Sequence, residues 1–199
     1  MKHIHPIHDR LISRAERQER NGHRACVIWL TGLSGSGKST LAESLERRLF
    51  ADRIQVVVLD GDNIRTGINN NLSFSEADRA ENIRRIAEVA KLFVQAGQVV
   101  ITSFISPTIA MRQMAREIIG AHDFFEVFVD SPLEVCESRD VKGLYQKARA
   151  GQISDFTGIH SAYEPPLTPD LHIDTAGQPL KASLGQLYEF VRDTIVMPE

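Results

Sequence analysis

Short runs of apolar residues alternate along this chain with longer stretches in which apolar residues recur every three or four positions. The runs at 25–30, 56–59, 99–105 and 124–129 predict β-strands, and residues 171–173 predict a short final strand. Within these runs nearly every position is apolar, as in Val56, Val57, Val58 and Leu59. Such a strand is typically buried on both faces of its sheet, so we expect a sheet covered on both sides.

Helical periodicity fills the stretches between these runs. Two apolar stripes, one before Gly97 and one that closes the chain, consist of Ile83, Ile86, Ala87, Ala90 and Val94, and of Leu180, Leu184, Leu187, Val191 and Ile195. Another helix is expected to begin at Ser131-Pro132, with the serine as its cap and Glu134 three residues on. Strands that alternate with helices predict an α/β fold, with a parallel sheet and helices on both faces. Ligands of such sheets bind at the carboxyl ends of the strands.

A glycine-rich segment directly follows the first predicted strand and leads into helical sequence. It completes the pattern G-x-x-x-x-G-K-[ST] with Gly32, Leu33, Ser34, Gly35, Ser36, Gly37, Lys38, Ser39 and Thr40. A strand that turns through glycines into a helix aims backbone N–H groups at one point, which is a phosphate site. We expect a nucleoside triphosphate there, with Lys38 at its β- and γ-phosphates, the Ser39 hydroxyl on Mg²⁺, and Thr40 supporting the helix start. The alternative is a glycine-rich turn without a ligand.

Two carboxylates end the second predicted strand. The sequence there is Asp60-Gly61-Asp62-Asn63, and Arg65 follows two residues later. Beside a phosphate loop, one carboxylate can help to hold Mg²⁺ and the other can accept the proton of an attacking hydroxyl. The alternative is a turn in which Asp62 only caps the next helix.

Two further segments carry polar groups that suit an anionic substrate. Arg79 and Asn82 lie three residues apart, so on a helix they share one face. A guanidinium binds phosphate or sulfate oxygens in a bidentate manner, and an asparagine can donate to the same group; the alternative is a solvated helix face. Ser106, followed by Pro107, could bind substrate or carry a phosphoryl group. We favour a helix cap for Ser106, because no base neighbours it in the sequence.

The segment 139–158 begins with basic residues, contains three glycines and lacks a clear strand. These features are typical of a mobile lid that closes over phosphates and excludes water, and the alternative is an insertion without a catalytic role. Near the start of the chain, His3, His5 and His8 could suggest a metal site. Because no second cluster of ligands accompanies them, we interpret them as part of a solvated arm.

Composition limits the class of protein. The 199 residues, 42% of them hydrophobic, fit one α/β domain with a full core. The net charge of −3 provides no basic field for nucleic acid or anionic lipid. No apolar stretch approaches the roughly 20 residues of a membrane helix, and we expect neither a membrane span nor a signal peptide. Cys26 and Cys136 are interpreted as buried hydrophobes of a reducing compartment, which indicates the cytoplasm.

Five segments together resemble the adenylylsulfate kinase (APS kinase) family. They are GLSGSGKST at 32–40, DGDNIR at 60–65, FSEADRAENIRR at 74–85, FISP at 104–107, and RDVKGLYQKARAG with FTG within 139–158. The phosphate loop occurs in many families, whereas its combination with DGDN, DRAENIRR and KGLYQKARAG is specific. The resemblance implies a P-loop NTPase-type three-layer domain at 23–199, with a lid at about 139–160 and an N-terminal helical arm at 1–22.

The resemblance implies transfer of the γ-phosphoryl group of MgATP to the 3′-hydroxyl of adenosine 5′-phosphosulfate (APS). The product is 3′-phosphoadenosine 5′-phosphosulfate (PAPS), used in sulfate assimilation. Catalytic roles are expected for Lys38, Asp60, Asp62 and Ser106. Arg139 is expected to contact ATP, together with the phosphate loop. We also expect a homodimer and a separate ATP sulfurylase for the preceding step.

The APS site follows from the same resemblance. Phe74 and Phe156 would sandwich the adenine, and Lys142 would join the lid to the substrate. The phosphosulfate would be bound by Arg65, Arg79 and Asn82, and further contacts would come from Gly61, Asn63 and Ile105. Related bacterial enzymes are described with a phosphoserine at the position of Ser106. We nevertheless favour direct in-line transfer assisted by Asp62, because a serine intermediate needs its own activation.

The chain departs from the usual family pattern at Ser73, at Thr108-Ile109 and at His160. These departures bear on substrate affinity and leave every residue with an assigned role in place. Two other classes of protein are weighed against this family. Another small-molecule P-loop kinase would give no reason for Phe74 and Phe156 together with DGDN, and a GTPase switch should show an N/T-K-x-D motif, which the sequence lacks.

Overall fold

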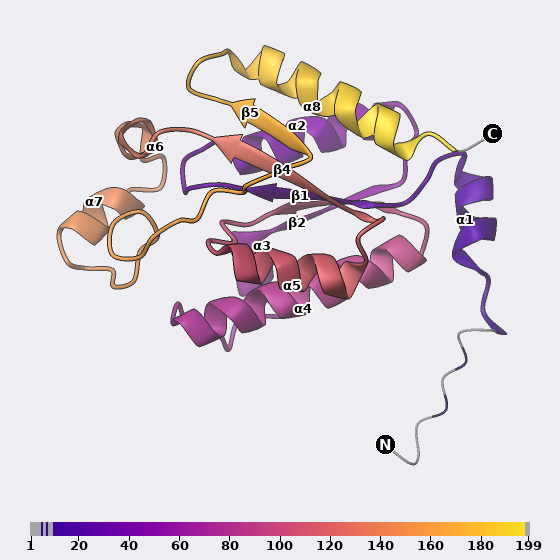
Figure 1. The fold of residues 1–199 in the computed structure, drawn as a ribbon, viewed down its shortest axis with the longest axis horizontal. Helices are drawn as coiled ribbons and strands as arrows, with labels where there is room; N and C mark the ends of the chain where they lie inside the picture. The colour runs from indigo at the N-terminus through magenta and orange to yellow at the C-terminus, as the bar shows by residue number, and fades with distance from the viewer. Residues whose placement is uncertain (1–4, 6, 8–9, 198–199) are drawn as a thin grey trace.

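The computed structural model describes residues 5, 7 and 10–197, and a five-stranded β-sheet lies at its centre (Figure 1). The strands are β1 (Val27–Thr31), β2 (Val56–Asp60), β3 (Val99–Ser103), β4 (Phe124–Asp130) and β5 (Leu171–Asp174). They stand in the order β2-β3-β1-β4-β5, and every pairing is parallel. The predicted α/β fold with a parallel sheet is confirmed.

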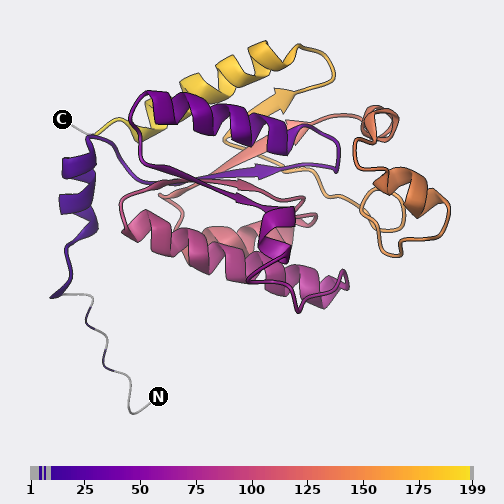
Figure 2. The same ribbon diagram turned by 180° about the vertical axis from the view of Figure 1, so that it is seen from behind.

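Helices cover both faces of the sheet (Figures 1 and 2). On one face lie α2 (Lys38–Ala51) and α8 (Leu180–Ile195), and on the other α4 (Glu76–Gln95), α5 (Ile109–Ile119) and the short α3 (Gly61–Arg65). A cluster of buried apolar side chains fills the space between the sheet and each helix layer. The predicted stripes of α4 and α8 face these clusters, except for Leu180, which is exposed.

The helix α1 (Arg14–Asn21) packs near the amino ends of the strands, far from the lid (Figure 1). Arg14 donates to both carboxylate oxygens of Asp123, at 2.5 Å through Nη1 and 2.7 Å through Nη2, just before β4 begins. The Asn21 side chain donates to the Gly97 carbonyl at 2.9 Å, just before β3. These contacts tie the N-terminal segment to the end of the sheet that carries no phosphate loop.

Three sequence expectations concern the chain's start, membranes and cysteines. His5 is exposed, whereas His3 and His8 lie outside the described residues. Within the described part of the chain, no helix has the length and apolar character to cross a membrane. Cys26 and Cys136 are free thiols and both are buried, as expected of small hydrophobes. Burial raises the pKa of Cys26 to about 12.

The chain between β4 and β5 projects beyond the carboxyl ends of the strands (left side of Figure 1). It contains α6 (Leu133–Arg139), α7 (Leu144–Arg149) and a loop in which Thr157 bridges to Ser161. We refer to residues 139–160 as the lid. The lid packs with α6 around a small buried cluster of its own: Cys136, Tyr145, Ala148 and Phe156.

One local expectation about packing holds in part, and one about capping is wrong. The strand β2 packs on both helix layers, with Val57 and Leu59 on one face and Val56 and Val58 on the other. Only Leu59 is fully buried, since β2 forms an edge of the sheet. Ser131 does not cap α6, whose N-cap is Pro132 and lacks a side-chain hydrogen bond. The position of a strand in the sheet and the residue at which the chain turns depend on tertiary packing rather than on the local pattern.

The expectation that Ser106 caps the following helix is also wrong. The N-cap of α5 is Thr108, whose hydroxyl accepts from the Met111 N–H at 3.2 Å. Ser106 has a φ of +39° and is 2% exposed, so its side chain turns into the protein. A non-glycine residue rarely adopts this conformation, which the surrounding contacts must therefore maintain.

Candidate active site

A large cavity of about 770 Å³ lies at the carboxyl ends of the strands. It is lined by most of the residues expected at the ATP and APS sites: Ser34, Gly35, Gly37, Lys38, Ser39, Thr40, Asp60, Gly61, Asp62, Arg65, Phe74, Arg79, Asn82, Ile105, Ser106, Arg139, Lys142 and Phe156. Four expected residues are not among its lining: Gly32, Leu33, Ser36 and Asn63. Leu33 lines a separate cavity of about 460 Å³, Ser36 is buried, and Asn63 is exposed on α3.

Glycine conformations shape the phosphate loop. Gly32 has a φ of +149°, and Gly37, the N-cap of α2, has a φ of +101°. A Cβ at Gly32 would lie 2.3 Å from the carbonyl oxygen of Val129, so only glycine lets the loop pack this closely on β4. The helix α2 begins at Lys38 and brings the free N–H groups of its first turn to the cavity.

The Lys38 side chain is held by the loop itself. It is 7% exposed, and its Nζ donates to the carbonyl oxygens of Gly32 at 2.8 Å and Leu33 at 2.6 Å. Burial lowers the pKa of Lys38 from 10.5 to about 8. Charged phosphate oxygens are stronger acceptors than carbonyl oxygens, so a phosphate bound in the loop can compete for this ammonium group.

Oxygen ligands suited to Mg²⁺ meet where α2 and β2 come together. Ser39 Oγ donates to Asp60 Oδ2 at 2.8 Å and lies 3.2 Å from Ser103 Oγ. Asp60 also caps α3 through the Asp62 N–H, at 3.1 Å, so the capping carboxylate is Asp60 rather than Asp62. Among the described residues, no group of three or more His, Cys, Asp or Glu could hold a metal alone. One hydroxyl and one carboxylate fit Mg²⁺, whose remaining ligands are usually waters and substrate phosphates.

Asp62 forms an ion pair with Lys142 of the lid. The two residues are 80 positions apart in the chain, and their side chains are 69% and 52% exposed. An ion pair this exposed contributes little to stability. Its effect is to bring a lid cation to the carboxylate that we expected to handle a proton.

Phe74 stands at the cavity with one ring face covered. Its side chain is 56% exposed, and the Arg65 guanidinium lies over the ring, 4.3 Å from the centroid. Arg65 also donates to the carbonyl oxygens of Leu72 at 3.3 Å and Ser73 at 3.2 Å. Both Arg65 and Phe74 line the cavity, and an aromatic ring there can stack on a flat ligand.

Phe156 and Asn82 bring an apolar and a polar group to the same cavity. Phe156 is 8% exposed and packs edge-on against Tyr145, with ring centroids 5.0 Å apart. Asn82 is 5% exposed, and its Oδ1 accepts from Asn69 Nδ2 at 2.9 Å. Because its oxygen is occupied, the Asn82 amide has its N–H groups left to donate.

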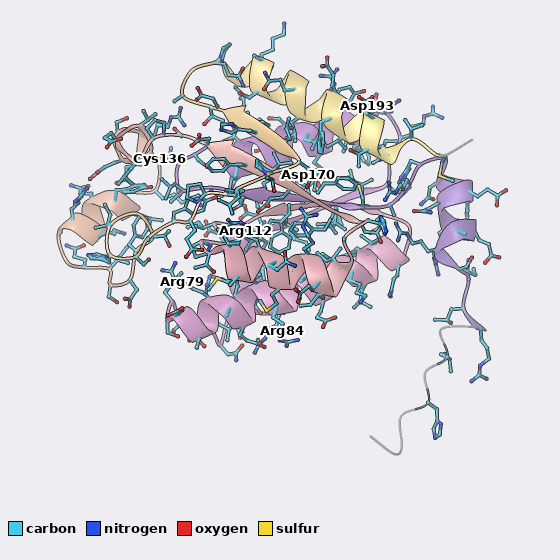
Figure 3. All side chains as sticks on the ribbon, viewed as in Figure 1. Arg79, Arg84, Arg112, Cys136, Asp170 and Asp193 are labelled. Carbon is cyan, nitrogen blue, oxygen red and sulfur yellow. The ribbon has the colours of Figure 1, made fainter. Side chains whose placement is uncertain are left out.

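Arg79 extends from α4 to the lid. Its Nε donates to the Phe74 carbonyl at 2.8 Å, and its terminal nitrogens donate to Thr157 Oγ1 and the Asp155 carbonyl. Figure 3 shows Arg79 at the end of α4 that lies nearest the lid. Burial lowers the pKa of Arg79, yet an arginine stays charged at neutral pH.

The Ser106 hydroxyl is engaged within the protein. It accepts from Trp29 Nε1 at 3.1 Å and donates to Thr31 Oγ1 at 3.1 Å. The Ser106 carbonyl accepts from the buried Arg112 at 2.8 Å. Neither partner of the hydroxyl is a base, so these contacts favour a structural role for the side chain.

A model of the adenylylsulphate kinase family matches residues 24–174. The chain belongs to the adenylylsulfate kinase family. The adenylyl-sulfate kinase of Bacteroides thetaiotaomicron is 56% identical to this kinase over 189 residues, which are 95% of this chain and 94% of that protein. The adenylyl-sulfate kinase of Yersinia pestis is 52% identical over 191 residues, 96% of this chain and 89% of that protein.

Solved structures agree with this assignment. The APS kinase of Mycobacterium tuberculosis, in complex with AMPPNP and APS, superposes on this kinase with a TM-score of 0.81 and 47% identity, covering 85% of this chain and 98% of that one. A sugar kinase from Janibacter has a TM-score of 0.55 and 18% identity, covering 84% of this chain and 95% of that one. The Janibacter protein therefore shares the fold alone.

Sequence reasoning missed several residues that support the kinase cavity. Thr175, just after β5, donates to the Ser36 carbonyl at 2.7 Å, and its own carbonyl accepts from Arg139 at 2.7 Å. The Tyr145 hydroxyl donates to the Ser34 carbonyl at 2.9 Å. These contacts fasten the last strand and the lid to the phosphate loop. The place of Thr175 at the end of a parallel strand could have indicated it, whereas no sequence signal marks Tyr145.

Proposed function

We propose that this adenylylsulfate kinase makes PAPS by bringing ATP and APS together in the 770 Å³ cavity. The reaction moves the γ-phosphoryl group of ATP to the 3′-hydroxyl of APS and leaves ADP. The observation that carries the proposal is that the phosphate loop and the pair Phe74 and Phe156 line one cavity. A triphosphate site and a site for a flat base in the same enclosure suit a reaction between two nucleotides.

On the ATP side, the phosphates would lie on the loop and on the N-terminus of α2. Lys38 would leave the loop carbonyls and stabilise the charge that shifts between phosphates during transfer. Ser39 and Asp60 would hold Mg²⁺, which supplies neutralisation of the β- and γ-phosphate oxygens. Arg139, which donates to the Gly35 carbonyl at 3.2 Å, would contribute from the edge of the lid.

On the APS side, Phe74 and Phe156 would stack on the two faces of the adenine. Arg65 supports this arrangement, because it covers the Phe74 face that the base would not use. The phosphosulfate is an anion, and the N–H groups of Arg65 and Asn82 can donate to it. Each aromatic face is worth about 1–3 kcal/mol, by analogy with bases stacked in single-stranded nucleic acids.

Transfer is proposed to be direct, with both substrates bound. Asp62 would orient the 3′-hydroxyl and take its proton as the phosphoryl group arrives, and Lys142 would keep the lid close to this step. A phosphoserine route would need a base at Ser106. The hydrogen bonds of Ser106 to Trp29 and Thr31 instead support a structural role.

The wider setting of the reaction is part of the same proposal. A homodimer, a cytoplasmic location and a separate ATP sulfurylase as the source of APS rest on the family resemblance. The two free, buried cysteines also suit a reducing compartment. Light scattering of the purified kinase tests the dimer.

The decisive experiment is a coupled assay of ADP release with ATP present and APS either present or absent. Release should depend on APS, and Lys38→Ala should abolish it while the circular dichroism spectrum stays native. Arg47→Ala, at an exposed position of α2, serves as a control and should keep wild-type turnover. ADP release that ignores APS, or normal turnover by a folded Lys38→Ala protein, would contradict the proposal.

A further inference from the structure

Arg79 joins the two segments that carry the aromatic residues of the cavity. Its guanidinium contacts the Phe74 carbonyl on one side and both neighbours of Phe156, namely Asp155 and Thr157, on the other. We propose that Arg79 is a positioning residue that sets the spacing of Phe74 and Phe156, and thereby the affinity for the adenine of APS. This inference rests on the proposed function, because it takes the two rings as walls of the adenine site.

The segment that carries Phe74 depends on polar contacts to hold it in place. Its ring is 56% exposed, so little apolar packing holds it in place. The backbone around it is restrained by polar contacts instead: the Ser73 N–H donates to Asp78 Oδ2 at 2.9 Å, and Arg65 donates to the Ser73 carbonyl at 3.2 Å. Arg79 adds the contact to the Phe74 carbonyl itself, at 2.8 Å. Of these contacts, only those of Arg79 continue to the lid.

The lid has a strained backbone next to Phe156, where Arg79 contacts it. Asp155 has a φ of +56°, a region that non-glycine residues seldom occupy. Its carbonyl accepts from Arg79, and Thr157, which is 1% exposed, accepts through its hydroxyl. Because these residues precede and follow Phe156, one guanidinium holds the backbone on both sides of the ring. Conformations of this kind persist only where surrounding contacts maintain them.

The shape of the arginine side chain makes this role specific. A guanidinium has five N–H donors in one rigid plane, so acceptors bound to different nitrogens stay at fixed separations. Three acceptors from two segments of the chain are bound in this way. A lysine ammonium is a single point of charge and cannot hold three acceptors in one plane. The remaining Arg79 donors are free to contact the phosphosulfate, so positioning and anion binding must be separated by experiment.

Arg84 offers a matched control on the same helix. It forms ion pairs with Glu81 at 2.7 Å and Glu88 at 3.9 Å, both on α4. Figure 3 shows it further along α4 than Arg79, away from the lid. Arg84→Met therefore removes an arginine from α4 without touching the contacts that carry the proposal.

The test measures inhibition by adenosine, which has the base of APS and lacks the phosphosulfate. ATP is kept saturating so that the ATP site is filled, and the inhibition constant (Ki) of adenosine is measured in competition with APS. The proteins compared are the wild type, Arg79→Lys, Arg79→Met, Thr157→Val and Arg84→Met. We expect the Ki to rise about tenfold in both Arg79 variants, the order of a stacking contact largely lost. Thr157→Val should raise it severalfold, although the arginine is still present. In the same variants the KM for APS should rise with the adenosine Ki, and kcat should change much less.

Unchanged adenosine inhibition in Arg79→Lys and Arg79→Met, beside a raised KM for APS, would show that Arg79 only binds the anion and would overturn the proposal. The same loss in Arg84→Met would overturn it too, since the effect would not depend on the lid contacts. Thermal unfolding shows whether each variant is folded. If an Arg79 variant is unfolded, the adenosine Ki of Thr157→Val tests the proposal in its place, and an unchanged value would overturn it. Failure of the proposed function has a different readout, which is wild-type ADP release that does not depend on APS.

Discussion

Binding of ATP should take up a proton at alkaline pH, because Lys38 is buried and partly neutral before the phosphates arrive. Desolvation lowers its pKa to about 8, whereas an ordinary lysine has a value of 10.5. Phosphate oxygens near the amine favour its charged form, so binding should return the pKa toward the ordinary value. The nucleotide then binds a lysine that must be fully protonated.

The size of the effect follows from the pKa. At pH 8.5 a lysine with a pKa of about 8 is about one quarter charged, so binding should take up about 0.75 proton. At pH 7 it is already about nine-tenths charged, and the uptake should fall to about 0.1 proton. The phosphates themselves add little at pH 8.5, because their second pKa lies near 6.

Calorimetry in two buffers with different ionisation enthalpies measures this uptake directly. The titration uses ATP without APS, so that no turnover contributes heat. Lys38→Arg is the matched control, because arginine keeps its charge at every pH of the experiment and should abolish the uptake. Equal binding enthalpies in the two buffers at pH 8.5, or the same uptake in Lys38→Arg, would refute the reasoning.

The same pKa has a consequence for stability in the absence of nucleotide. Between about pH 8 and 10.5 the unfolded chain binds more protons at Lys38 than the folded chain does. The free energy of unfolding contributed by this residue therefore rises with pH across that window. Chemical denaturation at several pH values, with Lys38→Met for comparison, should show this slope only in the wild type.

Three further predictions concern the rest of the site. Phe74→Ala or Phe156→Ala should weaken APS binding by about 1–3 kcal/mol and spare ATP binding, and calorimetry that found unchanged APS affinity would remove the aromatic sandwich. Ser106→Ala should keep substantial kcat and lose about 1–3 kcal/mol of stability, because a buried donor is left unpaired; a labelled phosphoserine that APS discharges at the turnover rate would contradict it. Asp62→Asn should slow transfer by about 10²–10⁴ in single-turnover assays, and a wild-type rate would exclude a base at this position.

Local chemistry made the phosphate loop and the strand ends predictable from the sequence. The loop needs glycines, a lysine and a serine at fixed spacing, and all of them lie within residues 32–39 of the chain. Asp60 and Asp62 were predictable for a similar reason. They lie at the carboxyl end of an apolar run, and ligands of a parallel sheet bind at the carboxyl ends of its strands. The placement of Phe74 and Phe156 came from the family resemblance rather than from any periodicity.

Contacts between distant segments could not be predicted in this way. Arg79 was expected to bind an anion, and nothing in its helical spacing indicated its bonds to the lid, 78 residues away. Ser106 before a proline resembles a helix cap, yet its hydroxyl bonds to Trp29, 77 residues away. The backbone turns at Ser106, where φ is +39°, and this turn directs the side chain into the protein instead of toward the helix start.

The sequence by itself determined the succession of strands and helices along the chain and the phosphate loop, because each depends on residues close together in the chain. The class of reaction followed from the resemblance of five segments to one family. Only the tertiary structure decided that β2 lies at the sheet edge, that Lys142 meets Asp62, and that Arg79 ties the lid to α4. These features arise when packing brings separate segments together. Which polar groups then meet depends on the geometry of the whole fold, which no local pattern of residues encodes.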